Sequence, residues 1–192
     1  MKDFINRLFY ADARLSRELR VPKEKRILSI LLKVFAHSGD SWFWLAGLFL
    51  VWLFSEGAWR ERAAFLSIGL FVMAAVVVVL KYTIRRPRPD GEWGQIYRIT
   101  DPHSFPSGHA ARSAALVVMG IAIGPPWFAI VLAIWAPWVG FSRVALGVHY
   151  VSDVVVGWLV GAVLGGIALI FRPEIVGFVD RVLDIIVRGS GN

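Results

Sequence analysis

Two histidines and one aspartate are the side chains with which this sequence is equipped for acid, base or nucleophilic chemistry. His109 follows a Pro-Ser-Gly segment at 106–108, and His149 is followed four residues later by Asp153. Two histidines can divide acid and base work when their surroundings hold them in opposite protonation states. On a helix, a spacing of four residues places the carboxylate beside the imidazole, where it fixes the tautomer and leaves the other nitrogen available. The absence of cysteine excludes a thiol nucleophile, a thiolate metal site and a disulfide.

Three basic residues and a predicted helix start are suited to binding phosphate. Phosphoryl transfer spreads negative charge over the equatorial oxygens, so a site without a metal needs fixed cations and hydrogen-bond donors. Lys81, Arg88 and Arg143 provide the cations, because a guanidinium binds phosphate oxygens as a fork and an ammonium acts as a compact charge. Ser107 and the backbone N–H of Gly108 lie at the expected helix start, which favours an anion. No metal-ligand cluster is visible in the sequence, so we predict a site without a metal or another cofactor.

Each of these residues also has an ordinary structural explanation. The basic residues fit the positive flank of a membrane span, Ser107 fits a helix N-cap, and Asp153 fits the cap of the next helix. A single histidine at a membrane interface is more often structural than catalytic. Each explanation is adequate for a single residue. Together, however, they would have to produce the complete ordered set of residues by chance.

The other polar residues near these segments give weaker signals. Three arginines are interpreted as lipid-phosphate or helix-flank charges: Arg85, Arg86 and Arg112. Contact with a lipid headgroup and a solvated loop explain a further group equally well: His37, Asp40, Glu92, Asp101 and His103.

The composition indicates a membrane protein. Of the 192 residues, 57% are hydrophobic, and the stretches 63–80 and 154–171 contain no charge. A membrane-spanning helix needs about 17 to 25 mostly apolar residues. We therefore predict an all-α fold, a polytopic membrane bundle of about five transmembrane helices. The predicted spans are 41–54, 63–80, 106–123, 127–141 and 154–171.

The residues before the first span are predicted to form interfacial amphipathic helices. Apolar residues recur at helical spacing from Phe4 to Leu19 with arginines between them. The segment 27–35 is too short to span a membrane, and the charged start of the chain does not resemble a secretory signal peptide. We predict a single membrane-embedded domain over residues 1–192. Its parts are interfacial helices at 1–40, a transmembrane core at 41–171 and a C-terminal tail at 172–192.

Five alternating spans bring the chemically competent segments together. The end of the second span, the start of the third, the end of the fourth and the start of the fifth all reach the same membrane face. The segments 81–89, 106–109 and 142–153 lie at these positions. Separated segments thus converge on one predicted site.

These three segments resemble the signature motifs of the type 2 phosphatidic acid phosphatase family, whose superfamily also includes the vanadium-dependent haloperoxidases. All key positions match in order and at family spacing, whereas the N-terminal region adds no motif. The resemblance implies that His149 is the nucleophile and forms a phosphohistidine intermediate. It also implies that His109 is the general acid that protonates the leaving oxygen.

The expected function is hydrolysis of a lipid phosphate at the membrane. Phosphatidylglycerophosphate or phosphatidate is the first choice of substrate, and undecaprenyl or another polyprenyl diphosphate is the alternative. A non-catalytic lipid-phosphate binder or transporter would need the cations but would gain nothing from two histidines and Asp153. A haloperoxidase would share the anion site, but the continuous spans argue against these soluble enzymes. The net charge of +7 is carried by residues that flank apolar spans, so membrane lipids rather than nucleic acid are the expected partners.

The distribution of positive charge predicts the side of the membrane. The chain up to and including Lys33 contains nine Lys or Arg residues, whereas the short loop on the opposite face contains Arg60 and Arg62. The positive-inside rule then places the N-terminus and the site in the cytoplasm, in a bacterial inner membrane. By resemblance, many relatives face the outside, and a membrane-spanning 27–35 segment would reverse the assignment. The sequence leaves the oligomeric state open.

Overall fold

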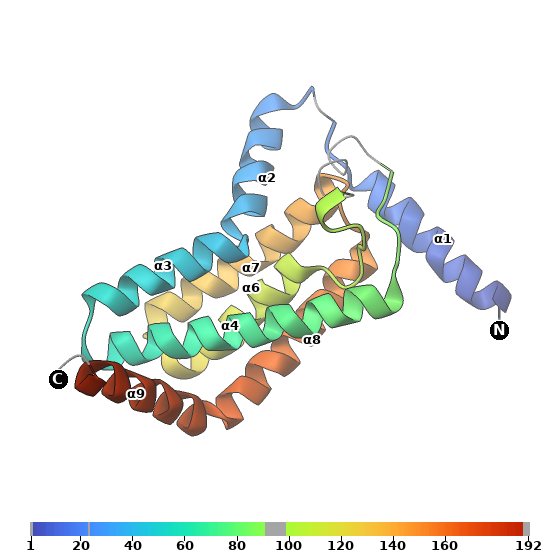
Figure 1. Cartoon of the computed structure of the whole chain (residues 1–192). Coiled ribbons are helices and arrows are strands. Elements are labelled where there is room, and N and C mark those ends of the chain that lie inside the picture. Colours follow the sequence, from blue (N-terminus) through green and yellow to red (C-terminus); the bar gives the residue numbers. More distant parts are fainter. Residues whose placement is uncertain (1, 23, 91–98, 190–192) are drawn as a thin grey trace.

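The computed structural model describes residues 2–22, 24–90 and 99–189, and these residues form helices and no β-strand (Figure 1). The all-α prediction is confirmed. The helices are α1 (Lys2–Glu18), α2 (Arg26–Ser38), α3 (Ser41–Phe54), α4 (Gly57–Ile84), α6 (Gly108–Ile123), α7 (Pro126–Ala145), α8 (Val151–Ile170) and α9 (Arg172–Gly189).

Five apolar helices correspond to the five predicted spans. α4, α7 and α8 are each long and apolar enough to cross a membrane. α3 and α6 are also apolar but have 14 and 16 residues. At 1.5 Å per residue they are about 21 and 24 Å long, shorter than the hydrocarbon core of about 30 Å. α4 extends beyond the predicted 63–80 at both ends, and its first turns carry Trp59 and Arg62, with the guanidinium carbon of Arg62 5.0 Å from the centroid of the Trp59 ring.

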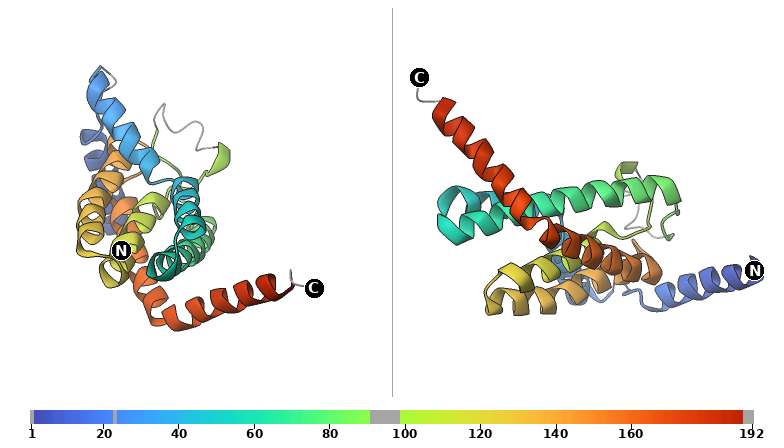
Figure 2. Two further views of the ribbon diagram at one scale, coloured as in Figure 1. Left: turned by 90° about the vertical axis from the view of Figure 1, so that its left-hand side faces the viewer. Right: turned by 90° about the horizontal axis from the view of Figure 1, so that it is seen from below.

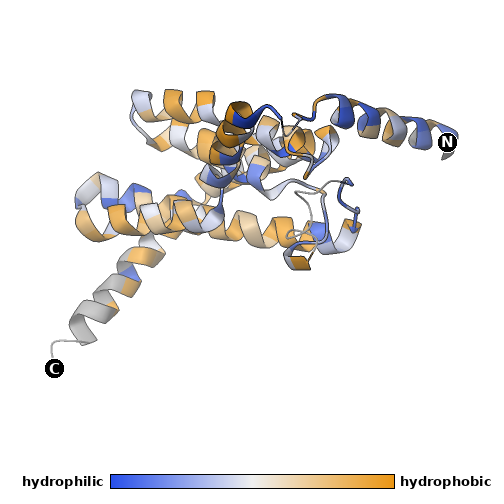
Figure 3. Cartoon of the chain, turned by 90° about the horizontal axis from the view of Figure 1, so that it is seen from above, coloured by the Kyte–Doolittle hydropathy of each residue, from blue (hydrophilic) through white to orange (hydrophobic). Residues whose placement is uncertain are grey.

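The bundle is packed inside and apolar outside. α6 lies against α4, α7 and α8 (Figure 1), and its Leu116 and Met119 are fully buried against Phe65 and Met73 of α4. Large apolar side chains of the spans also point outward and are more than half exposed, for example Phe71 and Leu159. Figure 3 shows apolar residues along the bundle helices and many hydrophilic ones on α1. An outer apolar surface is what hydrocarbon requires, so the helices indicate an integral membrane protein.

Three glycines of α8 allow α6 to approach closely. A Cβ atom at Gly157 would lie 2.6 Å from Ser107 O, and one at Gly161 would lie 1.9 Å from Ala111 O. Gly165 continues the row against Ala115. Small residues spaced by four let two membrane helices pack backbone to backbone. This contact places the beginnings of α6 and α8 side by side.

The terminal helices project from the bundle (Figure 2). α1 exposes Phe4, Leu8 and Phe9, which agrees with an amphipathic surface helix, although its place on a membrane stays a prediction. The predicted C-terminal tail is helical in the part that the structure describes, where it forms α9. Arg172 at the start of α9 binds Glu61 of α4, with Nη2 2.5 Å from Oε1.

Candidate active site

The three motif segments meet at the end of the bundle from which α1 departs (Figure 1). All eight residues predicted for the site lie at the end of α4, the start of α6, the end of α7 or the start of α8, or in the adjoining loops. Most are withdrawn from solvent: Arg143 is 2% exposed, His149 1% and Asp153 0%. The structure therefore confirms that these segments converge.

The contacts of His149 define which of its nitrogens carries a proton. Nδ1 lies 3.3 Å from Asp153 Oδ2, and Nε2 lies 3.2 Å from Arg88 Nη1. A guanidinium only donates hydrogen bonds and a carboxylate only accepts them. Nε2 must therefore accept from Arg88 through its lone pair, while Nδ1–H donates to Asp153. This tautomer presents a nucleophilic nitrogen on the side of the cations.

The surroundings of His149 keep the imidazole neutral. Burial lowers the pKa of His149 well below its usual range, and the positive charges of Arg88, Arg143 and Lys81 lower it further. Both effects disfavour the charged imidazolium form. The Nε2 lone pair thus remains available at neutral pH.

Asp153 both orients the histidine and caps α8. Its Oδ2 accepts the backbone N–H of Tyr150 at 2.9 Å as well as the His149 proton. Its Oδ1 accepts from Arg86 Nη1 at 2.7 Å. The cap considered as an ordinary explanation is present, but it coexists with the contact to His149. The fixed helix start holds the carboxylate in place beside the imidazole.

Two of the predicted phosphate-binding cations pair with one carboxylate. Asp101 accepts from Lys81 Nζ, and its Oδ2 also lies 2.8 Å from Arg88 Nη2. Arg88 Nε donates to the backbone oxygen of Asp101 at 2.7 Å. Arg143 has a further structural role, because its carbonyl accepts the backbone N–H groups of Val148 and His149 at 3.1 and 3.2 Å. The end of α7 therefore fixes the loop that carries His149.

Ser107 is a buried donor at the start of α6. It is 0% exposed, and within the part of the chain that the structure describes its Oγ has no hydrogen-bond partner. Its backbone N–H donates to Asp153 O at 2.9 Å, which ties it to the start of α8. An unpaired buried hydroxyl costs about 1 to 3 kcal/mol. A phosphate oxygen accepting from Ser107 would recover this cost.

His109 forms a hydrogen bond with the carboxylate of Asp40, the residue before α3. Its Nε2 is 2.7 Å from Asp40 Oδ1, and Asp40 Oδ2 is 3.1 Å from His37 Nδ1. Although burial opposes the negative charge, hydrogen bonds from His109 and His37 hold the pKa of the Asp40 carboxyl well below its usual range. Asp40 is therefore an anion in hydrogen-bond contact with His109, the second predicted catalytic histidine.

A cavity of about 520 Å³ leads to this end of the bundle. Its polar lining includes Lys81 and His109, and its apolar wall includes Met73 and Val77 of α4. A phosphate and the first carbons of a lipid chain are compatible with such a mixed lining. Of the residues for which the sequence allows headgroup contact, Asp40 and Asp101 line the cavity, whereas Glu92 lies outside the described residues.

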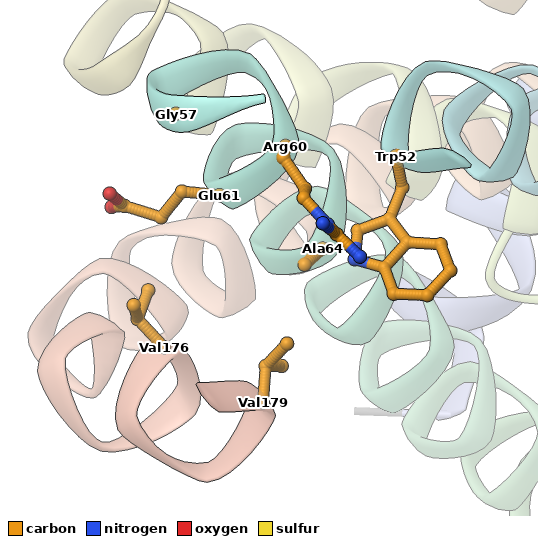
Figure 4. A pocket seen from close by; sticks show the side chains of 7 residues that line it. All are labelled: Trp52, Gly57, Arg60, Glu61, Ala64, Val176 and Val179. Atoms are coloured by element: carbon orange, nitrogen blue, oxygen red, sulfur yellow. The ribbon is translucent and has the colours of Figure 1, made fainter. Parts of the chain in front are cut away.

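A second cavity of about 330 Å³ lies between the start of α4 and α9. Figure 4 shows the Arg60 side chain extending to the Trp52 ring, with the guanidinium carbon 4.9 Å from the ring centroid. Val176 and Val179 of α9 form the facing wall. The lining of this cavity contains none of the predicted site residues.

A residue of α1 supports the site although the N-terminal region carries no motif. Asp12 Oδ2 accepts from Arg86 Nη2 at 2.7 Å and from Ser152 Oγ at 2.5 Å. Asp12 Oδ1 accepts the backbone N–H of Ser152 at 3.0 Å. Arg86 is thus shared between Asp12 and Asp153 rather than being a simple helix-flank charge. In the sequence, the spacing of Asp12 and Ser16 places two polar side chains on one face of the helix. This spacing does not indicate which other segment that face contacts.

Replacing Asp12 by asparagine is expected to lower the free energy of unfolding by about 1 to 3 kcal/mol. The amide nitrogen cannot accept from Arg86 and Ser152 as the carboxylate Oδ2 does. The midpoint of thermal unfolding in detergent measures the effect. Asp3→Asn, on the exposed surface of the same helix, is the matched control. Equal midpoints for the two variants would show that the Asp12 contacts add nothing.

Comparison with known proteins identifies the family. The family model described as the PAP2 superfamily matches residues 62–176, more than half of the chain. The chain belongs to the PAP2 superfamily. All eight predicted site residues lie inside the matched range, so the resemblance read from the three motifs is confirmed at the level of the PAP2 superfamily.

Two PAP2-like relatives carry names that specify a lipid substrate. The chain is 44% identical over 101 residues to decaprenylphosphoryl-5-phosphoribose phosphatase of Mycobacterium tuberculosis. The aligned segment covers 52% of this chain and 55% of the relative. It is 30% identical over 141 residues to undecaprenyl-diphosphatase of Sulfolobus acidocaldarius, covering 70% and 66%. The chain thus spans about half the length of the mycobacterial relative that it matches.

A solved PAP2 structure has the same overall fold. The crystal structure of a transmembrane PAP2 type phosphatidylglycerolphosphate phosphatase from Bacillus subtilis matches with a TM-score of 0.72 and 25% identity, and the match covers 88% of each chain. This neighbour is a membrane protein, which strengthens the conclusion drawn from the apolar outer surface.

Proposed function

We propose that this chain is a membrane phosphatase that hydrolyses a lipid phosphate through a phosphohistidine on His149. One observation carries the proposal: the His149 imidazole is held between Asp153 and Arg88, with the lone pair of Nε2 on the side of Arg88. A protein that only binds phosphate has no use for a neutral, oriented imidazole among its cations.

The first half of the reaction transfers the phosphoryl group to the protein. Nε2 of His149 attacks phosphorus, the P–N bond forms and the P–O bond to the lipid breaks. His109 gives a proton to the departing oxygen. Lys81, Arg88 and Arg143 carry the charge that develops on the equatorial oxygens, and a substrate phosphate competes with Asp101 for the first two. The hydroxyl of Ser107 and the N–H of Gly108 donate to the same oxygens.

The second half returns the protein to its starting state. Water attacks phosphorus, the P–N bond breaks and inorganic phosphate leaves. His109, now neutral, accepts the proton that the water loses, so acid and base work alternate on one imidazole. In this proposed reaction, the fixed cations of the protein stabilise the phosphate charge, and no step uses a metal ion. Among the described residues, no group of three potential metal ligands is assembled.

The substrate class rests on the relatives. The two relatives described above act, by their names, on polyprenyl-linked phosphates, which the sequence offered as the alternative. The structural neighbour is a phosphatidylglycerolphosphate phosphatase, the class that the sequence ranked first. We propose a lipid with a terminal phosphate or diphosphate at the interface and its chain beside the apolar wall of the 520 Å³ cavity.

Phosphate release from a panel of lipids tests this function. The panel contains phosphatidylglycerophosphate, phosphatidate, undecaprenyl diphosphate and decaprenylphosphoryl-5-phosphoribose, and each lipid is incubated with purified protein and a chelator. Release from at least one of them, and none by His149→Ala, is the expected result. Binding of these lipids without any release would favour a carrier or binding protein, and release that needs an added metal would refute the cation-only site.

We further propose that the site faces the cytoplasm. The basic N-terminal region is attached to the site end of the bundle, since Arg20 Nη1 donates to Asp90 O at 2.6 Å and Val21 N donates to Ala145 O at 3.0 Å. The opposite turn carries Arg60 and Arg62. The face with more positive charge remains inside under the positive-inside rule.

Cysteine labelling measures the sidedness, because the chain has no cysteine of its own. Ile99 is 86% exposed near the site, and Glu56 is exposed at the opposite turn. In intact cells, an impermeant thiol reagent is expected to label Glu56→Cys and not Ile99→Cys. Lysed cells provide the control, in which both should react. The reverse pattern in intact cells would place the site outside.

A further inference from the structure

The junction between α2 and α3 lies directly against His109. Gly39 and Asp40 form this junction. A Cβ atom at Gly39 would lie 2.8 Å from Val139 Cγ1 and 3.1 Å from His109 Cδ2. A larger residue at this position would push the junction away from the imidazole, so the glycine permits the close approach of Asp40 to His109.

Arg112 of α6 fixes the junction on both sides of Asp40. Its Nη1 donates to Gly39 O, and its Nη2 donates to Ser41 Oγ. Arg112 is 7% exposed, so these contacts replace those it would make with water. The sequence predicts a lipid-phosphate or helix-flank charge at Arg112, whereas in the structure this residue holds the backbone that carries Asp40.

Two tryptophans fix the same junction one residue earlier. Trp44 Nε1 donates to Ser38 O at 2.9 Å, and Trp135 Nε1 of α7 donates to Ser38 Oγ at 2.8 Å. Both indoles make these hydrogen bonds inside the protein. The position of Asp40 is therefore determined by α3, α6 and α7 together.

The charges around His109 create a need for a nearby anion. The positive groups that act on it are Arg112 on α6 and Arg143 on α7, and Lys81 on α4 lines the same cavity. A positive imidazolium is disfavoured by neighbouring cations. Asp40, with His37 on its other oxygen, brings the opposing negative charge to 2.7 Å from the ring.

We propose that Asp40 is a positioning residue for His109: it accepts a hydrogen bond from Nε2–H, stabilises the imidazolium among the cations and leaves Nδ1–H as the proton donor to the leaving oxygen. The inference rests on the proposed function, because it concerns the acid step of that reaction. Asp40 touches His109 and acts through it. It lies on a segment that contains none of the three motifs.

Asp40→Asn tests the proposal through its dependence on the leaving group. The alcohol released from a lipid phosphate must be protonated, whereas p-nitrophenol leaves readily as an anion. With the full chain in detergent, kcat/KM for the active lipid of the panel should fall about 10²-fold, and kcat/KM for p-nitrophenyl phosphate should fall less than about threefold. Asp40→Glu, which keeps the charge, should recover part of the lipid activity. Asp3→Asn on the exposed surface of α1 is the matched control.

The pH profile gives a readout that a purely structural role would not move. The acid form of His109 must be present, and loss of the anion weakens that form, so the alkaline limb with the lipid should shift to lower pH in Asp40→Asn. Inhibition by vanadate should remain, because the cations are unchanged. Equal losses for both substrates, an unmoved alkaline limb or lost vanadate inhibition would each overturn the inference while the wild-type protein stays active. Wild-type protein inactive on every substrate would instead refute the proposed function, and the inference with it.

Discussion

Replacing His149 by alanine is expected to lower kcat for the lipid substrate at least about 10³-fold while leaving the protein folded. The nucleophile carries the intermediate, so no other group can replace it by a small change in geometry. The folded state should persist because the removed imidazole contributes one hydrogen bond to Asp153, which keeps its bonds to Tyr150 N–H and Arg86. Phosphate release and the midpoint of thermal unfolding are measured on the same preparation.

His103→Ala is the matched histidine control for this experiment. His103 lies between the first two motifs, is partly exposed, and its ring contacts Tyr82 with 5.2 Å between centroids. Its loss should change kcat by less than about threefold, because the proposed reaction gives its side chain no role. Substantial turnover by His149→Ala, or an equal loss in both variants, would contradict the nucleophilic role of His149.

Exchanging Arg88 for lysine is expected to reduce kcat/KM about 10²-fold although the positive charge is kept. Arg88 donates to four acceptors, which are Val148 O, His149 Nε2, and the backbone and carboxylate oxygens of Asp101. A lysine ammonium cannot reproduce this planar fork, so phosphate binding and the orientation of the His149 loop should both suffer.

Inhibition by vanadate shows whether Arg88→Lys weakens binding of the five-coordinate transition-state geometry. Vanadate takes the five-coordinate geometry of the transition state, so its affinity should weaken in parallel with kcat/KM in Arg88→Lys. Arg85→Lys serves as the control, since Arg85 is exposed at the end of α4 and its Nε donates to Tyr82 O. Unchanged vanadate inhibition in Arg88→Lys would show that the charge alone is sufficient.

The sequence was sufficient to predict the five apolar helices and the convergence of the three motif segments. Long apolar runs mark membrane helices without reference to the rest of the chain, and α3 has the bounds predicted for the first span. The eight site residues were recognisable because distinct residue types recur in a fixed order across three segments. The same reasoning could not show that Ser104, in a polar loop, is fully buried.

The carboxylates around the site were not predictable in the same way. Asp12, Asp40 and Asp101 belong to no motif, and each contacts a residue at least 20 positions away in the sequence. Their partners depend on how helices pack, which periodicity alone does not determine. The row Gly157, Gly161 and Gly165 was an available signal for the closeness of α6 and α8. The single domain and the cytoplasmic site stay predictions.

Trapping the phosphoenzyme distinguishes a phosphohistidine on His149 from direct attack of water on the lipid phosphate. Protein is mixed with a lipid substrate of the panel that carries ³²P in its terminal phosphate, the reaction is stopped with alkali, and peptides are separated. A phosphohistidine survives base and is lost in acid. We expect base-stable, acid-labile label on the peptide that contains His149, and none in His149→Ala. Phosphate release without such label, or label on another residue, would contradict a phosphohistidine on His149.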